Sequence, residues 1–373
     1  MEKKNRIFGR IITRLIAKEE LSKTEAYDAF NMILNNEVSD MQQGAFLAAL
    51  TAKGETADEV AGGWRAIYEL DTEKVTFTDP EGVVDNCGTG MDTFKTFNIS
   101  TAAAIVAAGG GVKVARHGAR AISSVCGTVD MAEALGVDVE CGVEVVASSI
   151  RQAGLGLFNG MSSKVHPMAL SRILSQIHFG SPLNIAASLA NPALPKIAVR
   201  GVYAKDLLLP VAQVMQSIGY TDALVVYGSI NGSTQGMDEA SVCGTTCCAK
   251  LENGKISEFT FEPEDCGLPT HSALELAADA NISDAAVNMV ALLGEHSPGA
   301  RTDAVLLNAA LLFLVKGMVT TLKDGVEQAR GVLTTGQAMK TLRGWVALQN
   351  TTPDVGLTKL NHLQEKAATC RNC

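Results

Sequence analysis

The chain has 373 residues, of which 47% are hydrophobic and 19% are charged. This balance is typical of a globular protein with a large core, and it excludes a disordered chain. Lysine and arginine total 31 against 40 aspartates and glutamates, a formal charge of -9, so the overall field repels a nucleic-acid backbone. An anionic small ligand would therefore need local cationic side chains or a metal ion.

The ends and the apolar stretches of the chain predict a cytoplasmic protein without membrane association. At the N-terminus a charged run leads directly into an amphipathic pattern, so no export signal is visible. The most apolar stretch, residues 304–315, is too short to cross a bilayer, contains Asn308 and ends at Lys316. It therefore predicts a buried helix.

The 9 cysteines show no framework spacing, which favours reduced thiols in a cytoplasmic core. Cys243, Cys247 and Cys248, together with Cys370 and Cys373, could supply zinc ligands if the fold brought them together. Ordinary buried or surface thiols are the favoured interpretation.

The first part of the chain predicts a small helical domain over residues 1–76. Three capping boxes, each a Ser or Thr followed three residues later by Glu or Gln, precede apolar periodic runs. They are Ser22 with Glu25, Ser39 with Gln42, and Thr56 with Glu59. Residues 166–193 return to helical character, so the chain is expected to cross back to the helical domain there.

Residues 77–373 predict an α/β domain with a central, mostly parallel sheet. Short β-branched runs at residues 83–85, 112–115, 197–199 and 223–227 alternate with glycine-rich turns and helical windows. Strands that alternate with helices are typical of a parallel sheet covered by helices.

A glycine-rich loop at residues 87–92 is the first candidate site. It follows the strand at 83–85 and precedes Ser100, Thr101 and an alanine-rich helix. Backbone N–H groups of such a turn and the N-terminus of the helix both favour phosphate. The alternative from the glycines alone is a tight turn followed by an ordinary N-cap.

Three further groups of polar residues accompany the loop. Arg116 and His117 leave the second strand and precede small and hydroxyl residues, which suits an anion; the alternative is a solvated loop. The adjacent acids Asp238 and Glu239 suit Mg²⁺, although most acidic pairs are solvated surface. His166 and Arg172 could recognise an acceptor carboxylate, or could be a structural histidine and a surface charge.

The order of these motifs resembles the anthranilate phosphoribosyltransferase family, and the resemblance covers nearly the whole chain. It extends to residues 37–47, 53–56, 263–268 and 304–310. It implies a helical domain and an α/β domain with the active site between them, in a homodimer. The implied reaction transfers the phosphoribosyl group of 5-phosphoribosyl 1-pyrophosphate (PRPP) to anthranilate in tryptophan biosynthesis and releases pyrophosphate.

The resemblance also implies roles for particular residues. The PRPP contacts fall on Gly88, Thr89, Gly90, Met91, Asp92, Thr96, Asn98, Ile99, Ser100, Thr101, Arg116, His117, Gly118, Ala119, Ser123, Ser124 and Thr128, and the acceptor contacts on Gly88, Ala119, His166 and Arg172. Two magnesium ions are implied, one held by Ser100 with Glu239 and one by Asp238 with Glu239. The implied catalytic residues are Asp238, Glu239, Arg116 and His117.

The chain departs from the family pattern mainly at acceptor positions. Met91 replaces a second glycine, Arg116 replaces a lysine and Ala119 replaces an asparagine, while matching Arg172 to the family's carboxylate-binding arginine requires a shifted gap. These departures keep open a PRPP-dependent enzyme with another aromatic acceptor. A nucleoside phosphorylase and a non-catalytic nucleic-acid-binding relative are further alternatives, which the acidic pair and the negative charge disfavour.

Overall fold

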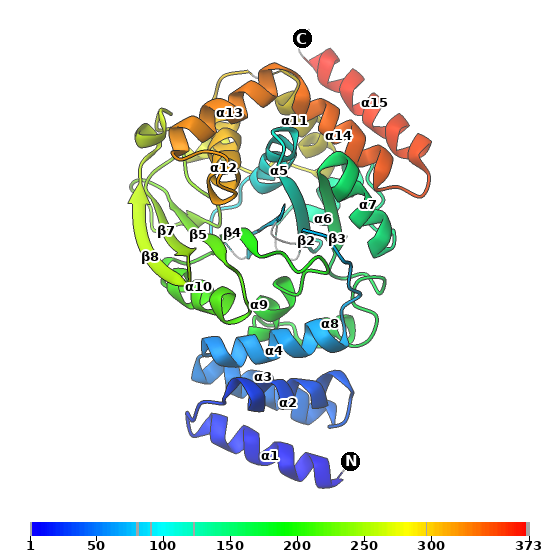
Figure 1. The fold of residues 1–373 in the computed structure, drawn as a ribbon, viewed down its shortest axis with the longest axis vertical. Coiled ribbons are helices and arrows are strands. Elements are labelled where there is room, and N and C mark those ends of the chain that lie inside the picture. The colour runs from blue at the N-terminus through cyan, green and yellow to red at the C-terminus, as the bar shows by residue number, and fades with distance from the viewer. Residues whose placement is uncertain (1, 80–81, 90–91, 122–123, 296, 371–373) are drawn as a thin grey trace.

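The N-terminal part of the computed structural model is a stack of four helices, α1 (Glu2–Ile16), α2 (Lys23–Leu34), α3 (Asp40–Lys53) and α4 (Ala57–Leu70). The structure describes residues 2–370 except 80–81, 90–91, 122–123 and 296. The capping boxes at Ser22 and Thr56 are confirmed, because each hydroxyl accepts a hydrogen bond from the N3 backbone. The stack forms one end of the molecule (Figure 1).

The capping box predicted at Ser39 is wrong. Ser39 is the N-cap residue of α3, but its hydroxyl makes no capping hydrogen bond. Its backbone N–H donates instead to Asn5 Oδ1 of α1 at 3.2 Å, which occupies the place that the Gln42 side chain would take. A contact with another helix has therefore replaced the local one.

The segment 166–193, which the sequence predicts to return to the helical stack, contains α8 (Leu170–Ile177) and α9 (Pro182–Ser188). The helix α9 packs against α3 and α4, and Trp64 of α4 donates its indole N–H to the carbonyl of Leu189 at 2.9 Å. One continuous apolar cluster joins these helices to the lower face of the sheet. The helical stack therefore shares an apolar core with the lower face of the sheet.

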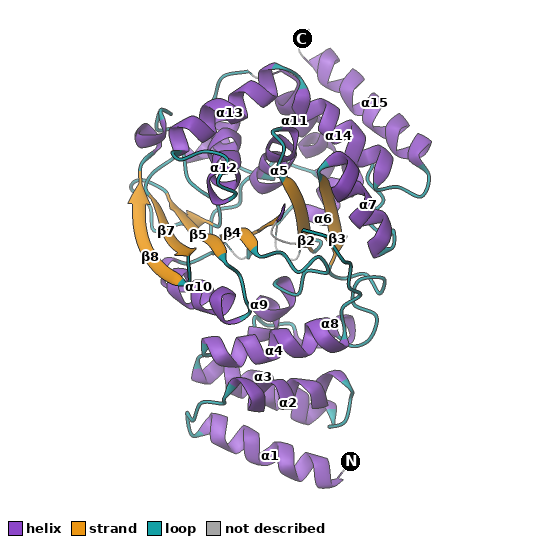
Figure 2. Cartoon of the chain, viewed as in Figure 1, coloured by secondary structure: helices purple, strands orange, loops and turns teal. Residues whose placement is uncertain are grey.

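A single mixed sheet organises the rest of the chain (Figure 2). Its order is β3-β2-β1-β4-β5-β7-β8, with the short β6 paired to β5. The five strands from β3 to β5 are parallel, whereas β6, β7 and β8 are antiparallel. The strands are β1 (Val83–Cys87), β2 (Lys113–Gly118), β3 (Leu155–Asn159), β4 (Ile197–Gly201), β5 (Asp222–Ser229), β6 (Gly236–Met237), β7 (Thr246–Glu252) and β8 (Lys255–Phe261).

Helices cover both faces of this sheet. The upper face carries α5 (Ile99–Gly109), α12 (Ala300–Val315) and further helices, whereas α9 and α10 (Leu208–Ser217) lie below it (Figure 1). The remaining helices are α6 (Thr128–Leu135), α7 (Val143–Ala153), α11 (Ile282–Glu295), α13 (Leu322–Thr334), α14 (Gln337–Leu348) and α15 (Pro353–Cys370). The buried helix predicted at residues 304–315 is confirmed as α12, and no helix in the described part of the chain is long and apolar enough to span a membrane.

The second strand is longer than the sequence indicated, and this changes the position of two candidate residues. β2 continues to Gly118, so Arg116 and His117 lie within the strand rather than on a loop after it. Successive side chains of a strand point to opposite faces. Arg116 consequently faces α5 above the sheet, and His117 faces α9 below it.

The zinc interpretation of the cysteines is not supported among the described side chains. Cys247 and Cys248 are neighbours on β7, so they belong to the cores on opposite faces of the sheet. The seven cysteines with described side chains are free thiols, and Cys373 lies outside the described residues.

Candidate active site

Three buried carboxylates meet at the carboxyl ends of the parallel strands. One carboxylate oxygen each of Asp92, Asp238 and Glu239 lies within 4.8 Å of the others. The loop after β1 reaches this position by pairing with β6, because Phe94 N donates to Gly236 O at 3.2 Å and Gly236 N donates to Thr93 Oγ1 at 3.1 Å. Asp92 thereby joins the acidic pair that the sequence predicted.

The backbone after Glu239 is anchored by an asparagine that the sequence analysis did not assign to the site. Asn308 of α12 accepts from the N–H of Ala240 at 2.9 Å and donates to its carbonyl at 2.9 Å. The signal in the sequence was the single amide within the apolar stretch 304–315, since a buried polar group needs partners. Asn308 therefore positions the segment that carries both acids.

The electrostatics of the three carboxylates favour a bound cation. Burial and the neighbouring Asp238 raise the pKa of Asp92 to about 6, despite the Lys95 ammonium 3.1 Å away. Burial and repulsion from Asp238 and Asp92 raise the pKa of Glu239 well above its usual value. Glu239 Oε2 finds no hydrogen-bond donor among the described residues. Oxygen ligands, high negative charge density and an unpartnered oxygen fit Mg²⁺.

Arg116 links the strand to the first turn of α5. Its guanidinium donates to Asn86 O at 3.0 Å, to Thr101 Oγ1 at 2.6 Å and to Ser100 Oγ at 3.0 Å. It also lies close enough to Glu239 for the two charges to influence each other's pKa. A cation, two hydroxyls and a helix N-terminus thus converge beside the carboxylates, as anion binding requires.

The close approach of Asp238 explains why residue 88 of the loop is a glycine. A Cβ built there would lie 2.2 Å from Asp238 Oδ2, so a side chain would displace the acid. The next residue, Thr89, has a buried hydroxyl without a partner in the described part of the chain. Gly90 and Met91 lie outside the described residues.

The other predicted PRPP contacts that the structure describes lie around the start of α5, the end of β2 and the start of α6. Asn98 donates to Cys126 O at 3.0 Å, which ties the start of α5 to the loop before α6. Thr96 forms an isolated β-bridge with Ala277. Ile99 is buried, Ser124 is partly buried and Ala119 is exposed. Gly118 ends β2, and Thr128 begins α6. Ser123 lies outside the described residues.

His117 and His166 form a buried pair on the opposite face of the sheet. Their Nε2 atoms are 3.1 Å apart, and His166 Nδ1 is 2.6 Å from Asp71 O. Assigning the proton of His166 to Nδ1, because that contact is the shorter, makes His117 Nε2 the donor between the rings. Burial lowers the pKa of both rings, that of His117 to about 3, so both are neutral at pH 7.

Arg172 lies apart from the histidine pair. Its guanidinium donates to Gln43 Oε1 at 3.2 Å and to Ile33 O at 3.1 Å. It therefore holds α8 to α2 and α3. The structure does not bring it together with His166.

A buried arginine that the sequence did not single out lies at the carboxyl end of β4. Arg200 is 2% exposed, and its Nη2 donates to Ser188 Oγ, while none of the described atoms accepts from its Nε or Nη1. Asp85, on the same face, likewise has a buried oxygen without a described donor, and burial raises its pKa to about 6. Arg200 directly follows the predicted strand at 197–199, but a strand-end arginine by itself is no signal.

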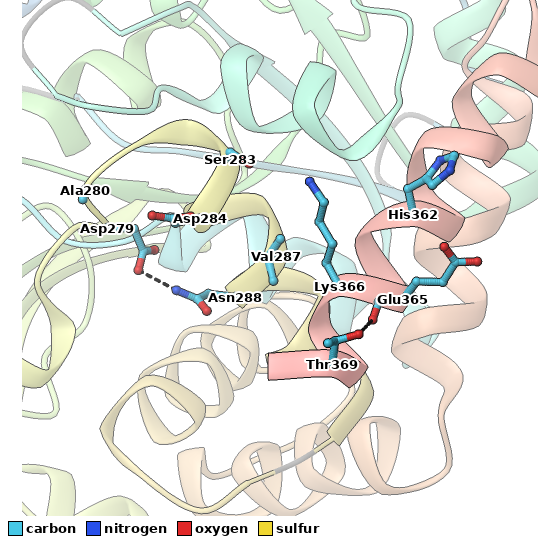
Figure 3. Close-up of a pocket in the computed structure, with 10 residues that line it drawn as sticks. All are labelled: Asp279, Ala280, Ser283, Asp284, Val287, Asn288, His362, Glu365, Lys366 and Thr369. Atoms are coloured by element: carbon cyan, nitrogen blue, oxygen red, sulfur yellow. Dashed lines mark hydrogen bonds between the residues drawn. The ribbon is translucent and has the colours of Figure 1, made fainter. Parts of the chain in front are cut away.

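A pocket of about 630 Å³ lies elsewhere, between α11 and α15 (Figure 3). Its α15 wall carries solvent-facing groups such as His362, Glu365 and Lys366, and on the α11 side Asn288 donates to Asp279. It contains none of the predicted site residues.

Comparison with known families agrees with this architecture. Residues 80–339 match the glycosyl transferase family a/b domain, and residues 10–70 match the helical bundle domain of the same family.

Individual relatives are similar over most of the chain. An anthranilate phosphoribosyltransferase of Anaeromyxobacter dehalogenans is 38% identical over 90% of this chain and 97% of its own, and one of Methanothermobacter marburgensis is 36% identical over 91% and 98%. The crystal structure of the Thermus thermophilus enzyme of that name has a TM-score of 0.81 at 32% identity, covering 91% of this chain and 98% of its own. The Saccharomyces cerevisiae enzyme in complex with PRPP and Mg has a TM-score of 0.79 at 22% identity over 93% of this chain and 99% of its own, which shows a shared fold.

The fold, the carboxylate and arginine centre and these matches define an enzyme of the pentosyltransferase class. Within that class, the chain belongs to the anthranilate phosphoribosyltransferase family.

Proposed function

We propose that this enzyme transfers the phosphoribosyl group of PRPP to the amine of anthranilate and releases pyrophosphate, a step of tryptophan biosynthesis. The observation that carries the proposal is the convergence of three buried carboxylates with Arg116 and the first turn of α5. Such a site can hold a metal-bound pyrophosphate on one side and phosphate oxygens on the other.

The reaction forms a bond from the amine nitrogen to C1 of the ribose and breaks the bond from C1 to the pyrophosphate oxygen, which keeps the electron pair. The proton of the attacking amine passes to solvent. An aromatic amine is neutral at pH 7 and nucleophilic, so the protein needs no strong general base. Positioning and charge neutralisation are then the main contributions of the chain.

We assign the metal site to Asp92, Asp238 and Glu239, with Ser100 at its edge. The carboxylates fit Mg²⁺ because their charges repel one another without a cation. When bound, magnesium would neutralise the negative charge that develops on the departing pyrophosphate. The proposal includes two magnesium ions, because Mg²⁺ usually binds through one or two carboxylates and three are available here.

On the phosphate side, Arg116 holds Ser100 and Thr101 in place and supplies a fixed positive charge. We propose that Gly88 and Thr89 approach the ribose and phosphates closely, since the first carries no side chain and the second has an unpartnered hydroxyl. Neutral His117 and His166 are proposed to shape the acceptor side.

The test is the loss of anthranilate fluorescence with PRPP and Mg²⁺. Asp238→Ala combined with Glu239→Ala should lower the rate at least about a hundredfold, because the metal loses two of its ligands. Glu19→Ala combined with Glu20→Ala is the matched control, since it removes an adjacent acidic pair from an exposed surface. Equal rates in the wild type and the site variant would refute the metal assignment.

A different aromatic acceptor is the second candidate, because exposed Ala119 offers no side-chain amide where the family pattern has one. Turnover of another aromatic amine with PRPP and Mg²⁺, without turnover of anthranilate, would favour it. A nucleoside phosphorylase would bind inorganic phosphate and need no magnesium, so the buried carboxylates oppose it.

We further propose a cytoplasmic homodimer. Large apolar side chains are exposed on the helical unit, Ile16 to 68% and Met41 to 86%, and each is a candidate contact between two copies of the chain. Sedimentation should give twice the mass of the chain, and Ile16→Lys combined with Met41→Lys should reduce the measured mass to that of one chain.

The cysteines with described side chains are free thiols, which suits the reducing cytoplasm.

A further inference from the structure

We propose that Arg200 binds the carboxylate of the aromatic acceptor and thereby selects acidic acceptors; this inference rests on the proposed function. Arg200 is almost fully buried, yet its Nε and Nη1, which carry most of its N–H groups, have no acceptor in the described part of the chain. A buried cation without acceptors is costly. A carboxylate would supply the missing acceptors.

The position of Arg200 places it next to the reaction centre. In the sheet it is the register partner of Cys87, the residue before Gly88. On the other side, the following residue Gly201 is so close to Asp238 that a Cβ there would lie 1.6 Å from the Asp238 carbonyl oxygen. A ligand atom held by Arg200 would therefore be near both the glycine loop and the carboxylates.

The face on which Arg200 lies distinguishes it from the phosphate side. Arg116 lies on the α5 face with Ser100 and Thr101, whereas Arg200 lies on the α9 face with Ser188. The same Ser188 contacts His117, whose Nδ1 is 3.3 Å from its carbonyl oxygen. The two arginines thus lie on opposite sides of the sheet edge, so an acceptor carboxylate at Arg200 would not compete with phosphate at Arg116.

Arg172 is the rival for the same role. Its guanidinium is already bound to Gln43 and to the backbone of Ile33 between helices. Arg200 has one described partner, a serine hydroxyl that also donates to Ile185 O at 2.8 Å. The arginine with unpartnered donors is the better anion receptor.

The experiment compares anthranilate with its neutral amide, 2-aminobenzamide, as acceptors. Arg200→Gln should lower kcat/KM for anthranilate about 10- to 100-fold, the loss expected for hydrogen bonds to a charged group. The KM for PRPP and the rate with the amide should change little, and Arg200→Lys should recover part of the selectivity. Unchanged selectivity in Arg200→Gln, or its loss in Arg172→Gln instead, would overturn the inference.

A structural role of Arg200 is tested separately, because it also offsets the buried charge of Asp85. Arg200→Met combined with Asp85→Asn removes both charges and should restore the thermal midpoint that Arg200→Met alone lowers. If Arg200 binds the acceptor, this double variant stays unselective. Recovery of selectivity along with stability would show that Arg200 acts only through the fold.

Direct binding separates this inference from the proposed reaction. Calorimetric titration with benzoate, which has the carboxylate but no amine, should show binding to the wild type that is lost in Arg200→Gln. Benzoate binding that depends on Arg200, without anthranilate turnover, would support the inference and refute the reaction. Anthranilate turnover with benzoate binding that is independent of Arg200 would do the reverse.

Discussion

At the scale of single residues, the buried histidine pair makes stability depend on pH. Burial lowers the pKa of His117 to about 3, below its ordinary value near 6.5. The unfolded chain therefore takes up the proton first, and stability is lost as the pH falls from 6.5 towards 3.

His117→Gln should remove part of this dependence. When the pH is lowered from 7.5 to 5.5, the unfolding free energy of the wild type should fall by about 1.4 kcal/mol more than that of the variant. The reason is that pH 5.5 lies one unit below the ordinary histidine pKa, so His117 is protonated in the unfolded chain but not in the folded one. Urea denaturation at each pH measures the difference. His362→Gln, on the exposed face of α15, is the control and should keep the wild-type slope. Identical pH slopes in His117→Gln and wild type would contradict the assignment of a neutral His117.

The asparagine behind the acidic pair offers a second test. Asn308→Leu leaves the N–H and carbonyl of Ala240 without their partners, so the unfolding free energy should fall by about 1–3 kcal/mol. The magnesium concentration for half-maximal rate should rise about tenfold, since the carboxylates lose their fixed position. Asn361→Leu, which removes an exposed contact to Arg343, should leave the magnesium response unchanged; an equal response in both variants would rule out a positioning role.

At the scale of elements, the contact between α2 and α4 depends on a glycine that the apolar periodicity did not single out. A Cβ at Gly62 would lie 2.5 Å from Lys23 O and 2.7 Å from Ala26 Cβ, so the two helices touch along their backbones. Gly44 of α3 has no such neighbour within 4 Å.

Two identical substitutions should consequently have opposite effects. Gly62→Ala should lower the unfolding free energy by about 1–3 kcal/mol through overpacking, whereas Gly44→Ala should raise it by up to about 1 kcal/mol through helix propensity. Chemical denaturation of both variants measures the difference. A stabilised Gly62→Ala would show that α2 and α4 are further apart than described.

Elements also differ in how well the sequence indicated them. The capping boxes at Ser22 and Thr56 are local hydrogen bonds within one helix turn, and both were predicted. Ser39 looked the same in sequence, but Asn5 of another helix binds its backbone. The strand β8 was missed because its residues are largely exposed at the sheet edge and lack a β-branched run.

At the scale of the whole molecule, the carboxylate cluster that is proposed to bind metal lowers the stability of the metal-free protein. Asp92, Asp238 and Glu239 repel one another when no cation is bound. Glu239→Gln should therefore raise the thermal midpoint of the protein in a metal chelator, because it removes a buried carboxyl group whose ionised form is repelled by Asp92 and Asp238.

The same variant should lose its response to ligands. Saturating PRPP with Mg²⁺, at about a hundred times its dissociation constant, should stabilise the wild type by about 2.7 kcal/mol and Glu239→Gln far less. Differential scanning fluorimetry with and without magnesium measures both effects. A ligand-induced shift in Glu239→Gln as large as in the wild type would show that the metal binds elsewhere.

The sequence by itself determined the class of fold, the glycine loop, the acidic pair and the family, because these depend on local periodicity and on short motifs whose residues are adjacent. Only the tertiary structure decided that Asp92 joins Asp238 and Glu239, that Asn308 anchors them, and that Arg116 and His117 serve opposite faces. Arg200 is the clearest case: its charge is visible in the sequence, but its burial and its unpartnered nitrogens arise from β1, β4 and α9 meeting in space. Long-range packing sets the partners of a side chain, and partners determine what that side chain can bind.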